Sequence, residues 1–179
     1  MSFIALRRGV WRYNMPRILH ITRTLLIGRA SARISLLVTL MQEARRRRYS
    51  LLARWCASRL ERYGNYISPH AKIGRRLKLP HPTSIVIGEG VIIGDDVTIY
   101  QNVTLGGRVL GDWKKGNYPE IAENTVIFAG AVIVGKVRIG RNCVVGANSV
   151  VTANIPDNAT AVGAPARIIK IKAEAQKET

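Results

Sequence analysis

The chain is poor in aromatic residues and in cysteine, and each shortage narrows what it can be. Aromatic residues make up 6% of its 179 residues, although 47% are hydrophobic. A folded core must therefore be filled mainly by aliphatic side chains. The two cysteines, Cys56 and Cys143, are too few and too far apart to indicate a disulfide framework. We expect a folded protein that works in a reducing cytoplasm.

Long apolar runs are also lacking. Arginines interrupt every apolar run among the first sixty residues, and the longest run, 34–41, is far shorter than the roughly 20 residues that a membrane-spanning helix needs. Nothing there reads as a cleavable signal peptide, although an Arg-rich, acid-poor start also fits, as a lesser alternative, an organelle transit peptide. We expect a cytoplasmic protein without a membrane span.

Acidic residues are scarce at the N-terminus. Residues 1–62 hold 14 arginines, no lysine and two acids, Glu43 and Glu61, for a formal net charge of +12 out of +17. Apolar residues there recur at helical spacing, which predicts a basic helical segment over 1–62. The two predicted amphipathic stripes are Ile18, Leu19, Thr22, Leu25 and Leu26, and then Leu36, Leu37, Leu40 and Met41.

Three roles compete for this basic segment. It can cap one end of the domain that follows, it can contact the anionic inner face of a membrane, or it can bind nucleic acid. Nucleic-acid binding is the weakest interpretation because no zinc-ligand spacing, helix-turn-helix pattern or interleaved aromatic residues accompany the charge. We expect a cap that also touches the membrane surface, including through the run 45–48, and no nucleic-acid partner.

A pattern of six residues follows the basic segment. Six units run without a break over 121–156, and further units cover 67–78 and 87–104; most open with Ile or Val and continue with a small or turn-forming residue. Hexapeptide repeats are typical of a parallel β-helix, in which each unit supplies one short strand and one turn. The sequence therefore predicts a mainly β domain over 63–170 and a polar tail over 171–179.

Two interruptions of the repeat are the places to look for function, because insertions in a solenoid form loops that are often binding sites. The first, 79–86, contains His81 between Pro80 and Pro82; the second is a loop at 106–120. A histidine titrates near neutral pH and is a natural general base for a hydroxyl, although a structural histidine is the alternative. His20 is expected to be structural, and His70, at a variable position of a regular hexad, is expected to be exposed and inert.

The motifs in and around these breaks resemble one family. Ile67-Ser-Pro-His-Ala-Lys-Ile-Gly, His81-Pro-Thr-Ser-Ile-Val-Ile-Gly-Glu, Gln101-Asn-Val-Thr-Leu-Gly-Gly, Tyr118-Pro-Glu-Ile and Ala161-Val-Gly-Ala-Pro-Ala-Arg are similar, in this order, to the serine acetyltransferase group of hexapeptide-repeat acyltransferases. The resemblance implies a left-handed β-helix and a homotrimer with active sites between subunits. It also implies acetyl-CoA as co-substrate, with no bound cofactor, and His81 as the catalytic base.

The resemblance also suggests how the substrates are held. Gly106 and Gly107 match the region that shapes the acyl site, where backbone N–H groups are candidates to stabilise an oxyanion. The CoA arm is expected to lie along small residues at Ala129, Gly130, Ala147 and Ala164, with Arg167 and Lys170 near its phosphates.

Departures from the family pattern concern the acceptor. Pro80 occupies the position where the family has an acid before the histidine, and Asn117 and Tyr118 occupy the positions of an Arg-His pair. Tyr66 replaces the acidic partner that orients the base, and Glu89 is a candidate to fill that role instead. A site that binds serine needs charged groups to pair with its ammonium and its carboxylate, whereas a site that binds a neutral sugar does not. We therefore expect transfer to a sugar hydroxyl of a cell-surface polysaccharide or its precursor, with serine O-acetylation of cysteine biosynthesis as the alternative. The candidate acceptor-binding residues are Gln101, Asn102, Trp113, Asn117 and Tyr118.

Two interpretations from other classes remain. A β-helix trimer can be a zinc hydratase, but a metal site of that kind needs three histidine ligands. His81 is the one plausible site histidine, and the only other histidine within the repeats is the exposed-looking His70, so no metal is expected. A catalytically silent trimeric scaffold is the other. Binding of acetyl-CoA separates it from an enzyme.

Overall fold

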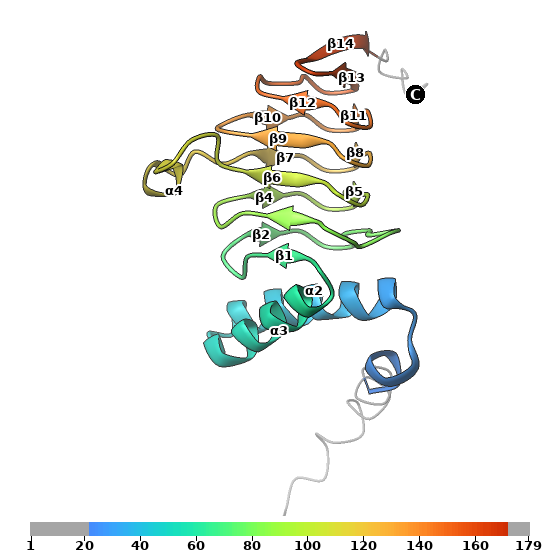
Figure 1. Ribbon diagram of the computed structural model, residues 1–179, viewed down its shortest axis with the longest axis vertical. Helices are drawn as coiled ribbons and strands as arrows, with labels where there is room; N and C mark the ends of the chain where they lie inside the picture. Colours follow the sequence, from blue (N-terminus) through green and yellow to red (C-terminus); the bar gives the residue numbers. More distant parts are fainter. Residues whose placement is uncertain (1–21, 172–179) are drawn as a thin grey trace, which may run out of the picture.

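The computed structural model describes residues 22–171, in which two helices close the lower end of a tall prism (Figure 1). Residues 22–27 are helical, followed by α2 (Ala30–Arg46) and α3 (Ser50–Arg62). The second predicted amphipathic stripe lies in α2, whose buried positions include Leu37 and Met41. Ile18 and Leu19 of the first stripe lie outside the described residues, whereas Thr22, Leu25 and Leu26 lie in the helical stretch at 22–27. No helix within 22–171 is long and apolar enough to cross a membrane.

The prism consists of very short strands. They are β1 (Tyr66–Ile67), β2 (Lys72–Ile73), β3 (Val86–Ile87), β4 (Ile92–Ile93), β5 (Thr98–Ile99), β6 (Thr104–Gly106), β7 (Glu120–Ile121), β8 (Val126–Ile127), β9 (Val132–Val134), β10 (Arg138–Ile139), β11 (Val144–Val145), β12 (Val150–Val151), β13 (Ala159–Gly163) and β14 (Ala166–Ile171). A short helix, α4 (Asp112–Lys115), lies in the loop between β6 and β7. Neighbouring strands pair in parallel except β13 with β14.

Three sheets form the faces of the prism. Face A contains β1, β3, β6, β9 and β12; face B contains β2, β4, β7 and β10; face C contains β5, β8, β11, β13 and β14. The chain visits A, B and C in turn, which makes one coil. Val86 pairs with Thr104, eighteen residues later, so a regular coil is three hexads. This architecture confirms the predicted left-handed parallel β-helix with a helical N-terminal segment.

The core is a set of aliphatic ladders inside the prism. The first residue of each hexad points inward, so that Ile87, Leu105 and Ile133 stack behind face A with no exposed surface. Turn residues of the hexads adopt the left-handed conformation, with φ of 58° at Asn102 and 54° at Asn142. Asparagine tolerates this backbone shape better than most residues, which explains why it recurs at the corners.

Both interruptions of the repeat are accommodated outside the core. Tyr66 pairs with Val86, twenty residues later, so the first coil has two residues more than a regular one, and the turn at 79–85 takes them up. Thr104 pairs with Val132, twenty-eight residues later, and the ten extra residues form the α4 loop. In Figure 1 the α4 loop projects on the left and the turn at 79–85 on the right.

Candidate active site

Each interruption lies at a different edge of the prism. We call the corner between faces C and A the histidine edge, formed by turns 79–85, 100–103, 128–131, 146–149 and 164–165. The corner between faces A and B is the loop edge, formed by turns 68–71, 88–91, 107–119, 135–137 and 152–154. The predicted site residues divide between these two edges.

His81 is exposed at the histidine edge, on a turn that a buried amide holds. Asn65 is buried and donates from Nδ2 to the carbonyl oxygen of Pro82 at 2.9 Å, while its Oδ1 accepts from the N–H of Ile85 at 3.1 Å. The carbonyl oxygen of His81 accepts from the N–H of Thr83 at 2.8 Å. The backbone on the C-terminal side of the histidine is therefore fixed. Sequence reasoning missed Asn65, which lies between two segments and carries no motif.

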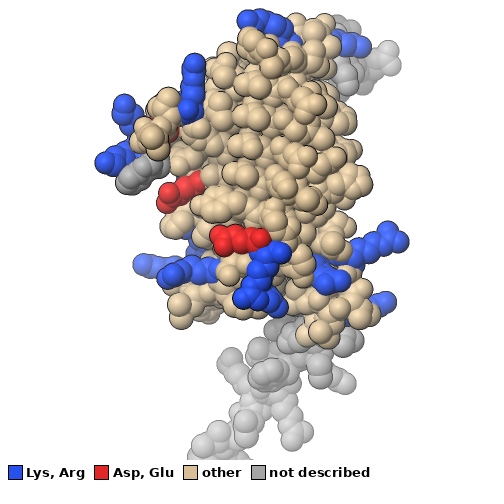
Figure 2. Space-filling view, viewed as in Figure 1, with Lys and Arg blue, Asp and Glu red and all other residues tan. Residues whose placement is uncertain are grey.

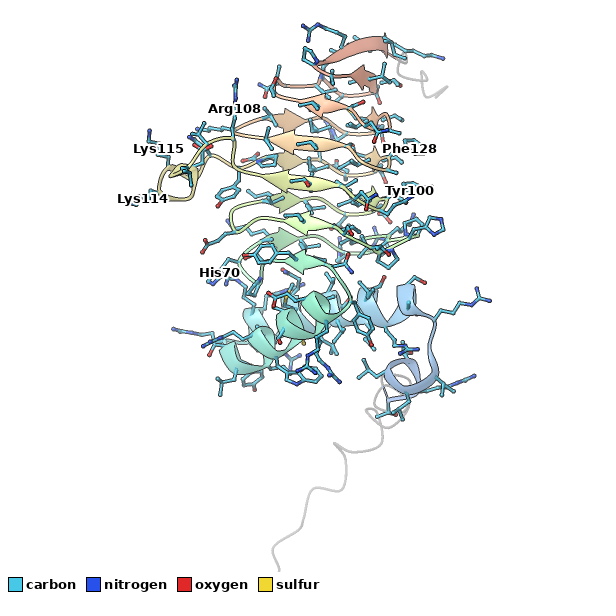
Figure 3. The ribbon with its side chains drawn as sticks, in the orientation of Figure 1. His70, Tyr100, Arg108, Lys114, Lys115 and Phe128 are labelled. Carbon is cyan, nitrogen blue, oxygen red and sulfur yellow. The ribbon has the colours of Figure 1, made fainter. Side chains whose placement is uncertain are left out.

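Aromatic rings continue from His81 along the same edge. The Tyr100 ring lies one coil further, with its centroid 6.2 Å from that of the His81 ring. Phe128, one more coil along, stacks on Tyr100 with centroids 5.1 Å apart (Figure 3). Phe128 remains 38% exposed. The sequence did not single out either ring, because residues 28 positions apart become neighbours only when the coils stack.

The predicted CoA-binding residues also gather at the histidine edge. Ala129 and Gly130 follow Phe128, and Ala147 and Ala164 lie on the next two coils. Gly130 has φ of 72°, and a Cβ there would collide with the side chain of Asn148. A glycine at this corner avoids that contact and keeps the surface beside it low. Arg167 and Lys170 lie exposed on β14, just beyond Ala164.

Two of the predicted acceptor-binding residues lie on this edge as well. Gln101 and Asn102 form the turn that follows Tyr100. The Oε1 atom of Gln101 is buried and is the one side-chain oxygen or nitrogen among the described residues that is buried without a hydrogen-bond partner. A buried, unpaired carbonyl oxygen is costly, so it is a natural acceptor for an N–H from a ligand or from another chain.

The remaining site residues lie at the loop edge, where Asp112 organises the loop. Asp112 is buried and accepts from the N–H groups of Arg108 and Val109 at 2.6 and 2.9 Å, and from the Asn117 side-chain amide at 2.9 Å. These hydrogen bonds lower the pKa of the Asp112 carboxyl, and the one from Asn117 has the largest effect. The Asn117 amide, predicted to bind the acceptor, thus already donates within the loop. Gly107 lies against Asp112.

Tyr118 closes the loop against the coil beneath it. Its ring covers the turn that contains Gly88 and Gly90, where a Cβ on Gly88 would come within 2.9 Å of the Tyr118 ring. Loss of hydration and then the negative charge of Glu89 raise the pKa of the Tyr118 hydroxyl. Glu89 is therefore a neighbour of Tyr118. It lies across face A from His81, so within one chain it does not orient the histidine as the sequence suggested.

The other predicted residues are placed as follows. Gly106 ends β6 at the loop edge, where its carbonyl oxygen accepts from the N–H of Gly135 at 2.9 Å. Trp113 is part of α4. His70, expected to be inert, receives a hydrogen bond of 2.8 Å from Arg45 of α2. Within residues 22–171, no group of three His, Cys, Asp or Glu side chains is arranged to hold a metal ion.

The comparisons with known proteins agree with this architecture. The family described as bacterial transferase hexapeptide (six repeats) matches residues 118–153. The chain is 48% identical over 107 residues to a serine acetyltransferase of Staphylococcus aureus (strain Mu50 / ATCC 700699), which covers 60% of this chain and 49% of the relative. The chain therefore spans about half the length of the curated relatives it matches.

Solved structures give the same result. A serine acetyltransferase in complex with CoA is 34% identical with a TM-score of 0.70, covering 82% of this chain and 60% of that one. The serine acetyltransferase of Brucella abortus strain S19 is 26% identical with a TM-score of 0.72, covering 90% of this chain and 71% of that one.

These similarities contradict the predicted sugar acceptor and its link to polysaccharide biosynthesis, because the similar proteins are serine acetyltransferases. The prediction was wrong because it judged charge only at the positions of the family motif. At the loop edge, Glu89 and Arg108 carry both signs of charge at other positions. By its repeats, its motifs and its fold, the described β-helix is a serine acetyltransferase-like hexapeptide-repeat domain.

Proposed function

We propose that the chain is an O-acetyltransferase that moves the acetyl group of acetyl-CoA to the hydroxyl of L-serine. The observation that carries the proposal is the alignment of His81 with the small residues of the CoA groove along one edge of the prism. The names of the similar proteins support serine as the acceptor. We assign the reaction to the domain at 63–170, with α2 and α3 as its cap.

The histidine edge matches the length of the donor. From the coil of His81 to that of Ala164 there are four strand spacings, or about 19 Å at roughly 4.8 Å each. An extended pantetheine arm has about this reach, so the thioester lies near His81 when the phosphates lie near Arg167 and Lys170. Guanidinium and ammonium groups form strong, charge-assisted hydrogen bonds with phosphate oxygens.

The proposed chemistry is a direct acyl transfer. The imidazole of His81 accepts the proton of the serine hydroxyl while the oxygen attacks the thioester carbonyl. A carbon–oxygen bond forms, the carbon–sulfur bond breaks, and the CoA thiolate leaves and takes up the proton from the imidazolium. Backbone N–H groups at Gly106 and Gly107 of a neighbouring chain are proposed to stabilise the oxyanion.

This arrangement requires a neighbouring chain, because one chain holds His81 and the loop on opposite edges of face A, and we propose that a homotrimer supplies it. The outward residues of face A are mostly apolar, namely Tyr66, Val86, Thr104, Val132 and Val150, whereas those of face B are mostly charged, namely Lys72, Ile92, Glu120 and Arg138. Face A therefore gains more than face B by being covered. Packing it against a second chain sets the histidine edge of one chain beside the loop edge of the next.

Serine is held at this junction by the groups that a zwitterion needs. We propose that Glu89 meets the ammonium group and that Arg108, at the base of the loop, meets the carboxylate (Figure 3). Gln101, Asn102 and Tyr118 then surround the serine side chain. Because Glu89 comes from the neighbouring chain, it can also approach His81 there.

The test is release of CoA from acetyl-CoA by the full chain. We expect turnover with L-serine, little with D-serine or glycine, and loss of nearly all turnover in His81→Ala with acetyl-CoA binding retained. Turnover by His81→Ala close to that of the wild type would show that His81 is not the general base. Acetyl-CoA binding without turnover on any hydroxyl amino acid would show that serine is not the acceptor. Absence of acetyl-CoA binding would show that the chain is a catalytically silent scaffold.

A further inference from the structure

Helix α3 exposes a face that the β-helix does not cover. Its inner side holds Ala53, Cys56 and Leu60, which are buried against α2 and the first coil. Leu51 and Trp55 lie four positions apart on the opposite side of the helix and are 80% and 48% exposed. Leu60 is the one leucine of α3 that is buried, whereas Leu51 and Trp55 point away from the protein.

Arginines surround these apolar side chains. The guanidinium of Arg59 lies 5.4 Å from the centre of the Trp55 ring. Between residues 45 and 62 the chain has seven arginines and one acid, Glu61. Figure 2 shows Lys and Arg side chains gathered around the lower part of the molecule. We call the following exposed residues the basal face: Leu51, Leu52, Arg54, Trp55, Arg59 and Arg62.

None of the basal-face residues is among the groups proposed for acetyl transfer, although His81 lies on the first coil, next to the end of α3. Helices α2 and α3 lie across the lower end of the prism, whereas the α4 loop and the turn of Phe128 are several coils above (Figures 1 and 3). The surface therefore has no part in the proposed reaction, and the inference drawn from it stands whether or not the chain acetylates serine.

We propose that the basal face binds the surface of an anionic lipid bilayer. Helices of this kind, with Trp and Leu on one side and arginines beside them, lie in the plane of the membrane interface. Leu51 and Trp55 enter the region between the headgroups, and the arginines donate hydrogen bonds to lipid phosphates. The ring of Trp55 suits this depth because it joins an apolar body to a polar N–H.

The charge and the apolar residues together select the bilayer over other partners. A second copy of the basal face would set arginines against arginines. A nucleic acid would satisfy the arginines but leave Leu51 and Trp55 in water. In the proposed trimer, prisms that run side by side point three basal faces in one direction, so that three weak contacts reinforce one another.

The experiment is sedimentation of the full chain with vesicles of phosphatidylcholine alone or mixed with phosphatidylglycerol. We expect binding to the mixed vesicles, weakened by salt, and none to phosphatidylcholine alone. Leu51→Ser/Trp55→Ser should lower the partition coefficient about tenfold or more. Arg54→Gln/Arg59→Gln/Arg62→Gln should lower it roughly a hundredfold at low salt, since each basic side chain contributes separately. Circular dichroism confirms that each variant is folded.

Matched controls change equivalent side chains elsewhere. Val109→Ser/Leu110→Ser removes two exposed apolar residues from the α4 loop, and Lys72→Gln/Lys136→Gln/Arg138→Gln removes three exposed cations from the flank of the prism. Both controls should bind vesicles like the wild type. Equal losses in the controls, wild-type binding by the basal variants, or equal binding to both kinds of vesicle would overturn the proposal. So would binding to duplex DNA but not to vesicles, or a change of oligomeric state in Leu51→Ser/Trp55→Ser without a change in vesicle binding.

Discussion

Asn65 and Pro82 are joined by a hydrogen bond of 2.9 Å between a buried side-chain amide and the carbonyl oxygen of the residue next to His81. The same amide nitrogen donates to the carbonyl oxygen of Tyr63 at 3.0 Å. Asn65 thus connects the end of the helical segment to the turn that presents the histidine. The widened first coil keeps a defined shape because this one side chain spans it.

Replacement of Asn65 by alanine should therefore affect both stability and catalysis. Asn65→Ala leaves the carbonyl of Pro82 and the N–H of Ile85 unpaired, so the free energy of unfolding should fall by about 2–4 kcal/mol. The turn loosens, and kcat for acetyl transfer should fall with little change in KM. Urea unfolding and steady-state kinetics measure the two effects. Asn154→Ala, at an exposed asparagine that accepts one backbone hydrogen bond, is the control; lower stability with unchanged kcat would show that the amide does not position His81.

The loop should become sensitive to acid through Asp112. Its pKa is lowered in the folded state by the hydrogen bonds from Asn117, Val109 and Arg108. A carboxyl of this kind stabilises the fold above its unfolded pKa of about 3.9 and ceases to do so as the pH falls through the lower folded value. Asp112→Asn should thus melt at a lower temperature than the wild type at pH 7, and the difference should shrink below about pH 4. A difference independent of pH would contradict this account.

The proposed phosphate contacts predict a selective effect on the donor. Arg167→Gln/Lys170→Gln should raise KM for acetyl-CoA about tenfold or more, because charge-assisted hydrogen bonds are worth about 1.5–3 kcal/mol each. KM for serine and kcat should change little, since both residues lie several coils from His81. The control Lys136→Gln/Arg138→Gln changes the same two charges on the flank of the prism. If the two double variants behave alike, the phosphates lie elsewhere.

The aliphatic ladder should be sensitive to truncation at a single position. Ile127 has no exposed surface and stacks between coils behind face C. Ile127→Ala removes three methyl or methylene groups from a closed prism and should lower the free energy of unfolding by about 2–5 kcal/mol. Ile169→Ala, at an exposed position of β14, should change it by no more than about 0.5 kcal/mol. Urea unfolding of both variants provides the comparison.

The fold could be predicted because a six-residue period is a local property. An aliphatic residue at the first position and asparagine at the corner specify a strand and a turn whatever lies elsewhere in the chain, and Ile87, Leu105 and Asn142 all take the expected places. The acidic and aromatic neighbours of the site could not be predicted in this way. Tyr100 and Phe128 stack because the α4 loop leaves the coil and returns to it without changing the register.

The acceptor prediction failed for the same reason, because it depended on residues that are distant in the chain. The sequence revealed that the family's ionisable residues were missing from four motif positions, but not that Glu89 lies beside Tyr118 on the edge that carries the α4 loop. Similar proteins named as serine acetyltransferases then contradicted the sugar acceptor.

The sequence by itself determined the β-helix and its two interruptions, because each depends on residues adjacent in the chain. His81 as the base stays a prediction from the sequence. The tertiary structure alone decided that His81 shares an edge with Gly130 and Ala147 while Glu89 and the α4 loop lie on another, and that Leu51 and Trp55 point away from the prism. Three hexads complete each turn of the helix, so the edge that a residue occupies follows from the closure of the coil and from every insertion before it.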